Sequence, residues 1–121
     1  ANTKRDFNYV GDVCEAFLAL IKAPKTDGKT INIGTGKEYS IKEIFSMICK
    51  LTKSNSKLTY DKKRVRPKKS EVLRLLCDNR KLVKLTNYKS KTKILDGLQK
   101  TIKWFSDKKN LSLYKTDIYN L

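Results

Sequence analysis

The sequence predicts an α/β fold, a small mixed unit of short strands and about four helices. Its 121 residues are enough for one domain and hardly for two. Segments with helical periodicity alternate with short β-branched or extended stretches, and turn signals separate them. The predicted order is β-α-β-α-β-α-α, with strands of only about four to six residues. A sheet of such short strands is expected to need a neighbouring element to complete it.

The first predicted elements are an extended segment and a helix. Aromatic and polar residues alternate over residues 5–10, as in a short strand. Asp12, followed three residues later by Glu15, predicts a capped helix start. Pro24 predicts the end of this helix, because proline disfavours helical backbone in the residue before it. The predicted buried face of this helix carries Val13, Phe17, Leu20 and Ile21.

A strand and a second helix are expected next. The segment TINIG, residues 30–34, is rich in β-branched side chains, and the Gly34-Thr35-Gly36 break follows it. Ser40 and Glu43 have the spacing of a capping box, and the helix that they open is expected to end within residues 53–57. The predicted buried side of this helix carries Ile41, Ile44, Phe45, Ile48 and Leu51.

The remaining chain is predicted to hold one strand, a long loop and two helices. Residues 57–60 resemble a strand, and residues 64–81 are mostly loop. Asp78 is expected to cap a short helix, with Asn87 in a left-handed turn after it, and Thr92 is expected to cap the last helix. Residues expected to face inward from these helices are Leu82, Val83, Leu85, Leu95, Leu98, Ile102 and Phe105.

Composition indicates a globular chain without a membrane segment. Apolar residues make up 39% of the sequence, which separates it from disordered chains. No stretch approaches the roughly 18 apolar residues of a membrane helix, and the polar N-terminus lacks the apolar segment of a signal peptide. We expect one domain over residues 1–110 and a C-terminal tail over residues 111–121.

The net charge of +16 is the strongest bias in the composition. Such an excess attracts polyanions, which include nucleic acid, anionic lipid and phosphate-bearing metabolites. Lysine supplies most of it and occurs in nearly every segment, as a general lysine bias would also produce. The charge alone therefore does not identify a partner.

The cysteines indicate a reducing compartment and no metal. Cys14, Cys49 and Cys77 are more than 25 residues apart, and the chain has no histidine. No pair has the spacing of zinc ligands, so we expect no metal site. The odd count without a disulfide framework favours a cytoplasmic location. Cys14 and Cys49 fall within apolar helical patterns, which predicts buried, unreactive thiols.

No catalytic motif is recognisable, and no catalytic residue is predicted. The chain has no histidine base, no GxSxG motif and no phosphate-binding P-loop. The Gly34-Thr35-Gly36 turn has two glycines rather than the three of a dinucleotide loop, and the next helix starts four residues later. A plain strand-to-helix turn is therefore the favoured interpretation of it.

Anion-binding residues are the chemistry that remains. Arg5 begins an extended segment, and Arg66 precedes Pro67, which stiffens the loop. A guanidinium in a stiff loop donates two parallel hydrogen bonds to a phosphate, whereas lysine acts as a point charge. Glu71 has the chemistry to accept hydrogen bonds from ribose hydroxyls. The alternative for each arginine is an ordinary solvated surface charge.

Four blocks of the sequence resemble a known family. RDFNYVGDV, TINIGTGKEYSIKEI, RVRPKKSEVLRLLCDNRKLVKLTNYK and TKILDGLQKTIKWF are similar, in this order and spacing, to the C-terminal part of the extended short-chain dehydrogenases. Those enzymes are NAD-dependent nucleotide-sugar epimerases and dehydratases. The resemblance is nearest to GDP-mannose and UDP-N-acetylglucosamine 4,6-dehydratases. Where the family usually has Leu-Gly-Trp, this chain has Thr86-Asn87-Tyr88.

The resemblance implies a substrate-binding lobe whose Rossmann half is absent. The glycine-rich NAD loop and the Tyr-x-x-x-Lys site of the family precede everything in this chain. NAD is therefore expected in the intact enzyme and not on this lobe, which is expected to be inactive alone. Arg5 and Arg66 match the family's diphosphate contacts, and Glu71 matches an acidic residue near the ribose. The segment TINIG and the first helix are expected to pack against the missing half.

Three functions stay open from the sequence. The first is the lobe of a nucleotide-sugar 4,6-dehydratase, which oxidises C4 of the sugar, eliminates water across C5–C6 and returns the hydride. The second is the same lobe of a 4-epimerase, and the intact enzyme is expected to be a homo-oligomer in either case. The third is a basic nucleic-acid-binding domain. Its aromatic residues fall mostly at core-facing helical positions, which argues against base stacking and makes nucleic acid an unlikely partner.

Overall fold

The computed structural model describes residues 3–59 and 72–114, and a three-stranded sheet lies at its centre. The strands are β1 (Lys4–Arg5), β2 (Tyr39–Ser40) and β3 (Arg74–Leu75), in the order β2-β1-β3. β1 pairs with β2 antiparallel and with β3 parallel, so the sheet is mixed. Each strand has only two residues, and β1 supplies the hydrogen bonds to both neighbours.

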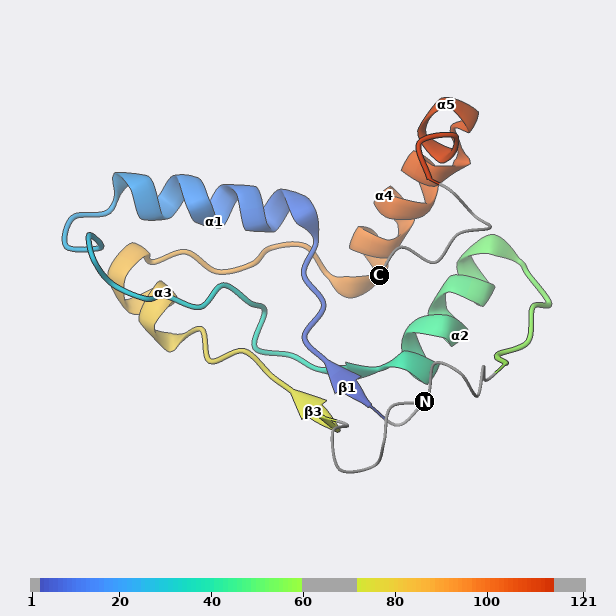
Figure 1. Ribbon diagram of the computed structural model, residues 1–121, viewed down its shortest axis with the longest axis horizontal. Helices are drawn as coiled ribbons and strands as arrows, with labels where there is room; N and C mark the ends of the chain where they lie inside the picture. The colour runs from blue at the N-terminus through green and yellow to red at the C-terminus, as the bar shows by residue number, and fades with distance from the viewer. Residues whose placement is uncertain (1–2, 60–71, 115–121) are drawn as a thin grey trace.

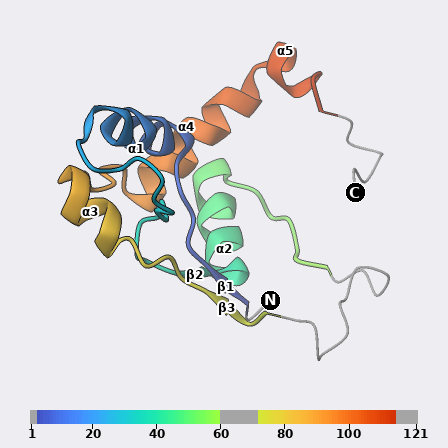
Figure 2. The same cartoon turned by 60° about the vertical axis from the view of Figure 1, so that its left-hand side comes forward.

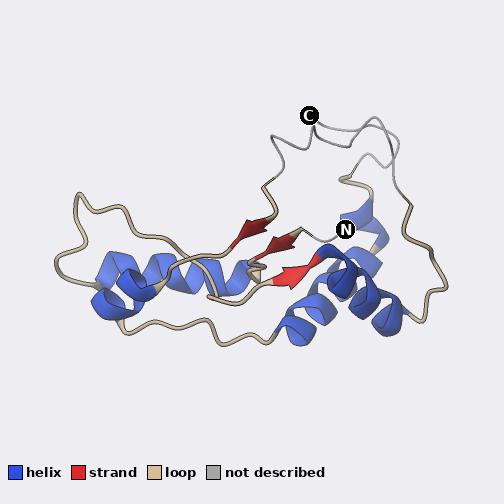
Figure 3. Ribbon diagram, turned by 90° about the horizontal axis from the view of Figure 1, so that it is seen from below, coloured by secondary structure: helices blue, strands red, loops and turns tan. Residues whose placement is uncertain are grey.

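Two pairs of helices lie on either side of this sheet (Figures 1 and 3). The helices are α1 (Val10–Lys22), α2 (Ile41–Thr52), α3 (Arg80–Thr86), α4 (Ile94–Ser106) and α5 (Lys108–Leu111). α1 contacts α3, α2 contacts α4, and α5 continues from α4. The predicted mixed α/β class and the order of element types are confirmed, with α5 as an additional short helix.

Two of the predicted strands lie in the wrong place, and the first, expected over residues 5–10, covers only Lys4–Arg5. Residues 30–34 and 57–59 form no strand, and Tyr60 lies outside the described residues. β2 and β3 occur instead at residues 39–40 and 74–75, because these are the segments that lie beside β1. A strand is defined by its partner, and two-residue strands are too short to produce an alternating pattern.

Asp12 does not cap α1, which corrects the prediction. Tyr9 is the N-cap, and Asp12 lies inside the first turn with only 6% of its surface exposed. Its carboxylate accepts hydrogen bonds from the Ser90 hydroxyl, the Thr92 amide at 3.0 Å and the Thr92 hydroxyl at 2.7 Å. The Tyr88 hydroxyl donates to the Asp12 carbonyl at 2.7 Å. Asp12 therefore joins α1 to the connection between α3 and α4.

The other predicted helix ends are partly confirmed. Ser40 and Glu43 form the capping box of α2, and Asn87 has the left-handed backbone expected after α3, with φ 56°. The cap predicted at Asp78 is one residue too early, because Asn79 is the N-cap of α3. The Asp78 carboxylate still accepts a hydrogen bond from the Arg80 amide at 3.1 Å. Thr92 binds Asp12 and does not cap α4.

The hydrophobic core of the described residues is small. Ala16, Ile44 and Leu82 are its buried apolar side chains. Several side chains expected to face inward are exposed instead, namely Phe17, Ile21, Ile41, Leu95 and Phe105. Cys14, predicted to be buried, is exposed, and Cys49 is half-buried. Polar contacts such as those of Asp12 therefore carry an unusual share of the stability. Among the described residues, no helix is long and apolar enough to cross a membrane.

Replacing Asp12 should destabilise the fold. Asp12→Ala leaves the Ser90 and Thr92 donors without their acceptor in a part-buried place, which should cost about 2–3 kcal/mol of unfolding free energy. Chemical denaturation measures this loss. Asp27→Ala removes the same charge from an exposed turn and is the control, expected to change stability by less than about 0.5 kcal/mol. Equal effects of the two substitutions would contradict the assigned role.

The same contact predicts a pH dependence. Burial raises the pKa of Asp12, but hydrogen bonds from Ser90 and Thr92 outweigh this and leave the pKa below its ordinary value of 3.8. The folded pKa is lower than the unfolded one, so the contribution is complete above pH 3.8 and is lost as pH falls below it. The stability difference between wild type and Asp12→Ala should therefore shrink in denaturation series below that pH.

Candidate functional site

The two residues of β1 place their side chains on opposite faces of the sheet. Lys4 shares one face with Arg74 and Ser40, its partners in the register. Glu38 joins the cations of that face: its carboxylate is 2.5 Å from Arg74 Nε and 3.5 Å from Lys4 Nζ. The hydrogen bond from Arg74 is the main cause that lowers the pKa of Glu38. These cations therefore stabilise the sheet.

Arg5 lies on the other face, beside Tyr39 and Leu75 in the register. It is half-buried, and its Nη1 donates to the Lys4 carbonyl at 2.8 Å. A guanidinium has five N–H donors in a planar arrangement that fits a phosphate. The central strand thus fixes the position of the backbone that carries the predicted anion-binding arginine.

A cavity of about 630 Å³ lies next to Tyr39. It separates the chain that leaves β1 from the first turns of α4, and a site of this volume accommodates a small molecule. The Lys100 ammonium lies over the ring of Tyr9, a lining residue, at 4.9 Å from the ring centre. Lining side chains include Phe7, Tyr9, Lys37, Tyr39, Thr92 and Leu98. Arg5 does not line the cavity and adjoins it through Tyr39.

The Gly34-Thr35-Gly36 turn is a structural turn. The Asp6 carboxylate accepts hydrogen bonds from the Thr35 amide at 3.1 Å, the Thr35 hydroxyl at 2.5 Å and the Gly36 amide at 2.9 Å. Gly36 has φ +71°, which favours glycine. Asp6 occupies the amides that a nucleotide phosphate would need. This observation supports the plain turn over the nucleotide loop.

Close packing at Gly34 brings a third segment to this turn. A Cβ at Gly34 would lie 2.2 Å from Cys77 Cβ, so only glycine fits, and Asn79 Nδ2 donates to the Gly34 carbonyl at 3.0 Å. Burial and the carboxylates of Asp6 and Asp78 raise the pKa of the Cys77 thiol. Cys77 therefore has a packing role.

Of the three predicted site residues, the structure describes Arg5. Arg66 and Glu71 lie outside the described residues, so their convergence with Arg5 stays a prediction. The chain is described again from Val72, and the Leu73 carbonyl accepts the Lys4 amide at 2.8 Å. In the sequence, Arg66 and Glu71 come shortly before β3, the strand that pairs with β1. No three metal-ligating side chains come together within residues 3–59 and 72–114.

The sequence did not predict the roles of two carboxylates near Arg5, those of Asp6 and Glu38. Asp6 directly follows Arg5, but its partners are about 30 residues away and no local pattern indicates them. Glu38 likewise binds Arg74, 36 residues further along the chain. The adjacency of Asp6 to the predicted anion binder was the available signal.

The profile of a known family matches residues 1–101, and that family is described as GDP-mannose 4,6 dehydratase. The chain belongs to this family. Among its curated relatives, the UDP-N-acetyl-alpha-D-glucosaminuronate decarboxylase of Bacillus cytotoxicus is 34% identical over 108 residues. That match covers 88% of this chain and 33% of the relative.

Solved structures agree with this membership. The epimerase Mth375 of Methanothermobacter thermautotrophicus superposes with a TM-score of 0.79 and 28% identity, over 93% of this chain and 32% of that one. The Bordetella bronchiseptica enzyme WbmF, solved with NAD+ and UDP, superposes with a TM-score of 0.70 and 29% identity, over 92% and 30%. The expected resemblance to nucleotide-sugar epimerases and dehydratases is confirmed. The chain spans about a third of the length of these relatives.

Replacing Asp6 should loosen the turn beside Arg5. Asp6→Ala removes the acceptor of two amides and one hydroxyl, which should lower the unfolding free energy by about 2 kcal/mol. Thr35→Val removes only the hydroxyl donor and should cost about half as much. Thermal or chemical denaturation ranks the two variants. A Thr35→Val loss larger than that of Asp6→Ala would show that Asp6 does not organise the turn.

Proposed function

We propose that this chain is the substrate-binding lobe of an NAD-dependent nucleotide-sugar 4,6-dehydratase. Residues 1–110 form the lobe, residues 111–121 form a tail, and the lobe is inactive alone. The observation that carries the proposal is the family match over residues 1–101, together with the place of Arg5 on the central strand. The chain spans about a third of the length of its relatives, which supports a lobe that works with a larger partner.

The lobe's proposed task is to position the nucleotide diphosphate. Arg5 and Arg66 bind the phosphate oxygens, and Glu71 accepts a hydrogen bond from the ribose. Binding energy from these remote groups orients the sugar in the intact enzyme, which places the reacting carbon at the cofactor. A fixed backbone at Arg5 reduces the entropy lost when the phosphate binds.

NAD belongs to the part of the enzyme outside this lobe in the proposal. The cofactor accepts a hydride from C4 of the sugar and returns it after water is eliminated. Within the described residues, the Gly34-Thr35-Gly36 turn binds Asp6 and does not fit a dinucleotide phosphate. WbmF, solved with NAD+ and UDP, supports both ligands for the intact enzyme.

The exposed face of α1 supports a partner half. Val10, Phe17, Leu18 and Ile21 are exposed apolar residues on this helix, and Ile21 has 81% of its surface exposed. So continuous an apolar face on one helix indicates an interface. The NAD-binding half is the partner that we propose for it, within a cytoplasmic and homo-oligomeric enzyme.

A 4-epimerase is the second candidate. The epimerase Mth375, with a TM-score of 0.79, favours an epimerase reaction. Both reactions begin with oxidation at C4, so the lobe's role is the same in each. An assay of the lobe joined to its cofactor half separates them by product: the dehydratase forms a 4-keto-6-deoxy sugar with loss of water, and the epimerase forms the C4 epimer. We expect the dehydrated product, and formation of the epimer alone would contradict the assignment.

Removal of either arginine should weaken nucleotide binding. Arg5→Ala and Arg66→Ala each remove one bidentate phosphate contact, which is worth on the order of 2 kcal/mol, or tenfold or more in affinity for UDP or GDP. Titration calorimetry measures the affinity. Arg80→Ala is the matched control, because Arg80, the exposed first residue of α3, pairs with Asp78 and lies outside the proposed site.

Two results of this titration would overturn the proposal. Unchanged affinity for UDP and GDP in both arginine variants would show that Arg5 and Arg66 form no diphosphate site. Sub-micromolar binding of random duplex DNA at physiological salt, with a steep salt dependence, would instead indicate a nucleic-acid-binding domain.

A further inference from the structure

The end of α4 and α5 carries an exposed cluster of aromatic and aliphatic side chains. Its members, the C-terminal cluster, are Trp104, Phe105, Leu111, Leu113 and Tyr114. Trp104 has 43% and Leu113 73% of its surface exposed. Figures 1 and 2 both place this end at the periphery, where α5 projects away from the sheet. The core therefore does not explain these residues.

The rings of the cluster are packed against one another. Trp104 lies 4.9 Å from Phe105 and 6.0 Å from Tyr114, and Phe105 lies 5.1 Å from Tyr114, each measured between ring centres. All three pairs are edge-to-face. Asn110 Nδ2 donates to the Trp104 carbonyl at 2.9 Å, which ties α5 to the end of α4. The cluster is thus a preformed apolar surface.

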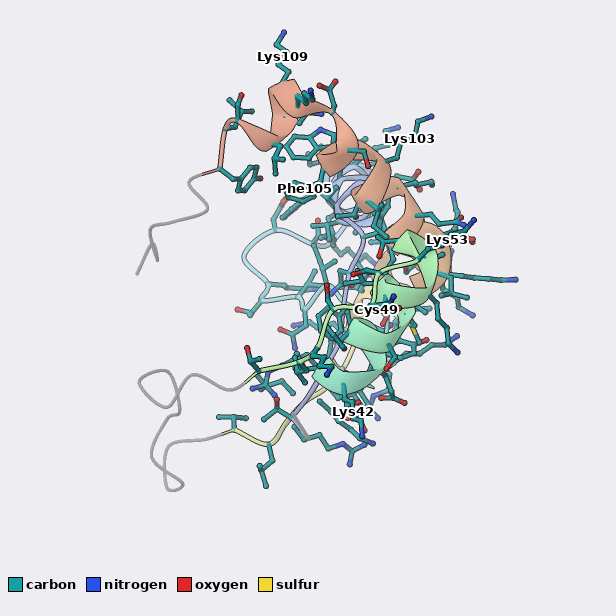
Figure 4. The ribbon with its side chains drawn as sticks, turned by 90° about the vertical axis from the view of Figure 1, so that its right-hand side faces the viewer. Lys42, Cys49, Lys53, Lys103, Phe105 and Lys109 are labelled. Carbon is teal, nitrogen blue, oxygen red and sulfur yellow. The ribbon has the colours of Figure 1, made fainter. Side chains whose placement is uncertain are left out.

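Three lysines lie near this surface. Lys103, Lys108 and Lys109 are exposed, and Figure 4 shows Lys103 and Lys109 pointing outward at the same end as Phe105. The nearby acid, Asp107, is bound as a cap, since its carboxylate accepts the Lys109 amide at 2.8 Å. Aromatic residues with a basic rim are the composition of surfaces that lie in the headgroup region of an anionic bilayer.

We propose that the C-terminal cluster docks on an anionic lipid surface. Trp104 and Tyr114 would lie at the headgroup level, Leu111 and Leu113 would enter the apolar boundary, and the lysines would contact lipid phosphates. The net charge of +16 strengthens attraction to such a surface. This inference concerns a surface separate from Arg5 and does not depend on the proposed nucleotide site.

Two other occupants fit the cluster less well. A second copy would bring two highly positive surfaces together, which like-charge repulsion opposes. Nucleic acid would need open ring faces for base stacking, and the edge-to-face packing of the three rings covers part of those faces. An anionic bilayer satisfies both the apolar centre and the basic rim.

Trp104 is the single tryptophan of the chain and reports binding directly. The chain is titrated with vesicles of phosphatidylglycerol and phosphatidylcholine, and separately with vesicles of phosphatidylcholine alone. We expect a blue shift of the Trp104 emission with the anionic vesicles, and quenching by brominated acyl chains. The shift should weaken as salt rises.

Matched variants test the basic rim. Lys108→Gln with Lys109→Gln should lower vesicle affinity by roughly 30-fold, because each lysine near the surface contributes about fivefold. Lys22→Gln with Lys84→Gln removes the same charge from α1 and α3 and should change affinity by less than about threefold. Leu113→Ser should reduce the blue shift while the far-ultraviolet circular dichroism stays unchanged.

Four outcomes would overturn the inference. The first is that anionic vesicles leave the Trp104 emission unchanged. The second is that the emission shifts with protein concentration in the absence of vesicles, which would indicate a second copy. The control lysine pair could matter as much as Lys108 and Lys109, which would indicate charge attraction without docking. The shift could also disappear once the chain is joined to its cofactor half, which would show that the half covers the cluster.

Discussion

The hydrogen bonds that Asp12 accepts from Ser90 and Thr92 connect the two sides of this structure. One side is the pair α1 and α3, and the other is the pair α2 and α4 (Figure 1). Among the residues that the structure describes, few apolar side chains are fully buried, so apolar packing alone fixes the arrangement of these pairs only weakly. A carboxylate with several donors is directional, so it defines the position of α4 relative to α1.

The thin core and the exposed apolar surfaces have a common origin. A chain of 121 residues that spans about a third of its relatives has a large surface for its volume. α1 has an exposed apolar face, and segment 30–34 forms no strand. The polar contacts of Asp6 and Asp12 order the lobe's own loops. The residues that order these loops therefore differ from the exposed apolar residues of α1.

The sequence predicted features whose causes are local and missed those whose causes are distant. The capping box of Ser40 and the left-handed Asn87 depend on neighbours a few residues away, and both were predicted correctly. Asp12 has the pattern of a cap, but its partners lie about 80 residues further on, and tertiary contacts decided its role. The strands at 39–40 and 74–75 exist through pairing with β1 alone. At the candidate site, Arg5 was identifiable from its block, whereas the binding of Asp6 to the turn was not.

Because side chains alternate along β1, its two basic residues lie on opposite faces of the sheet. Lys4 faces Glu38 and Arg74, while its neighbour Arg5 faces Tyr39. Substitutions on one face therefore leave the other largely untouched. A substitution at Arg5 therefore leaves the ion pairs of Glu38 in place, so the charge on one side of β1 and the pairing on the other are independently variable.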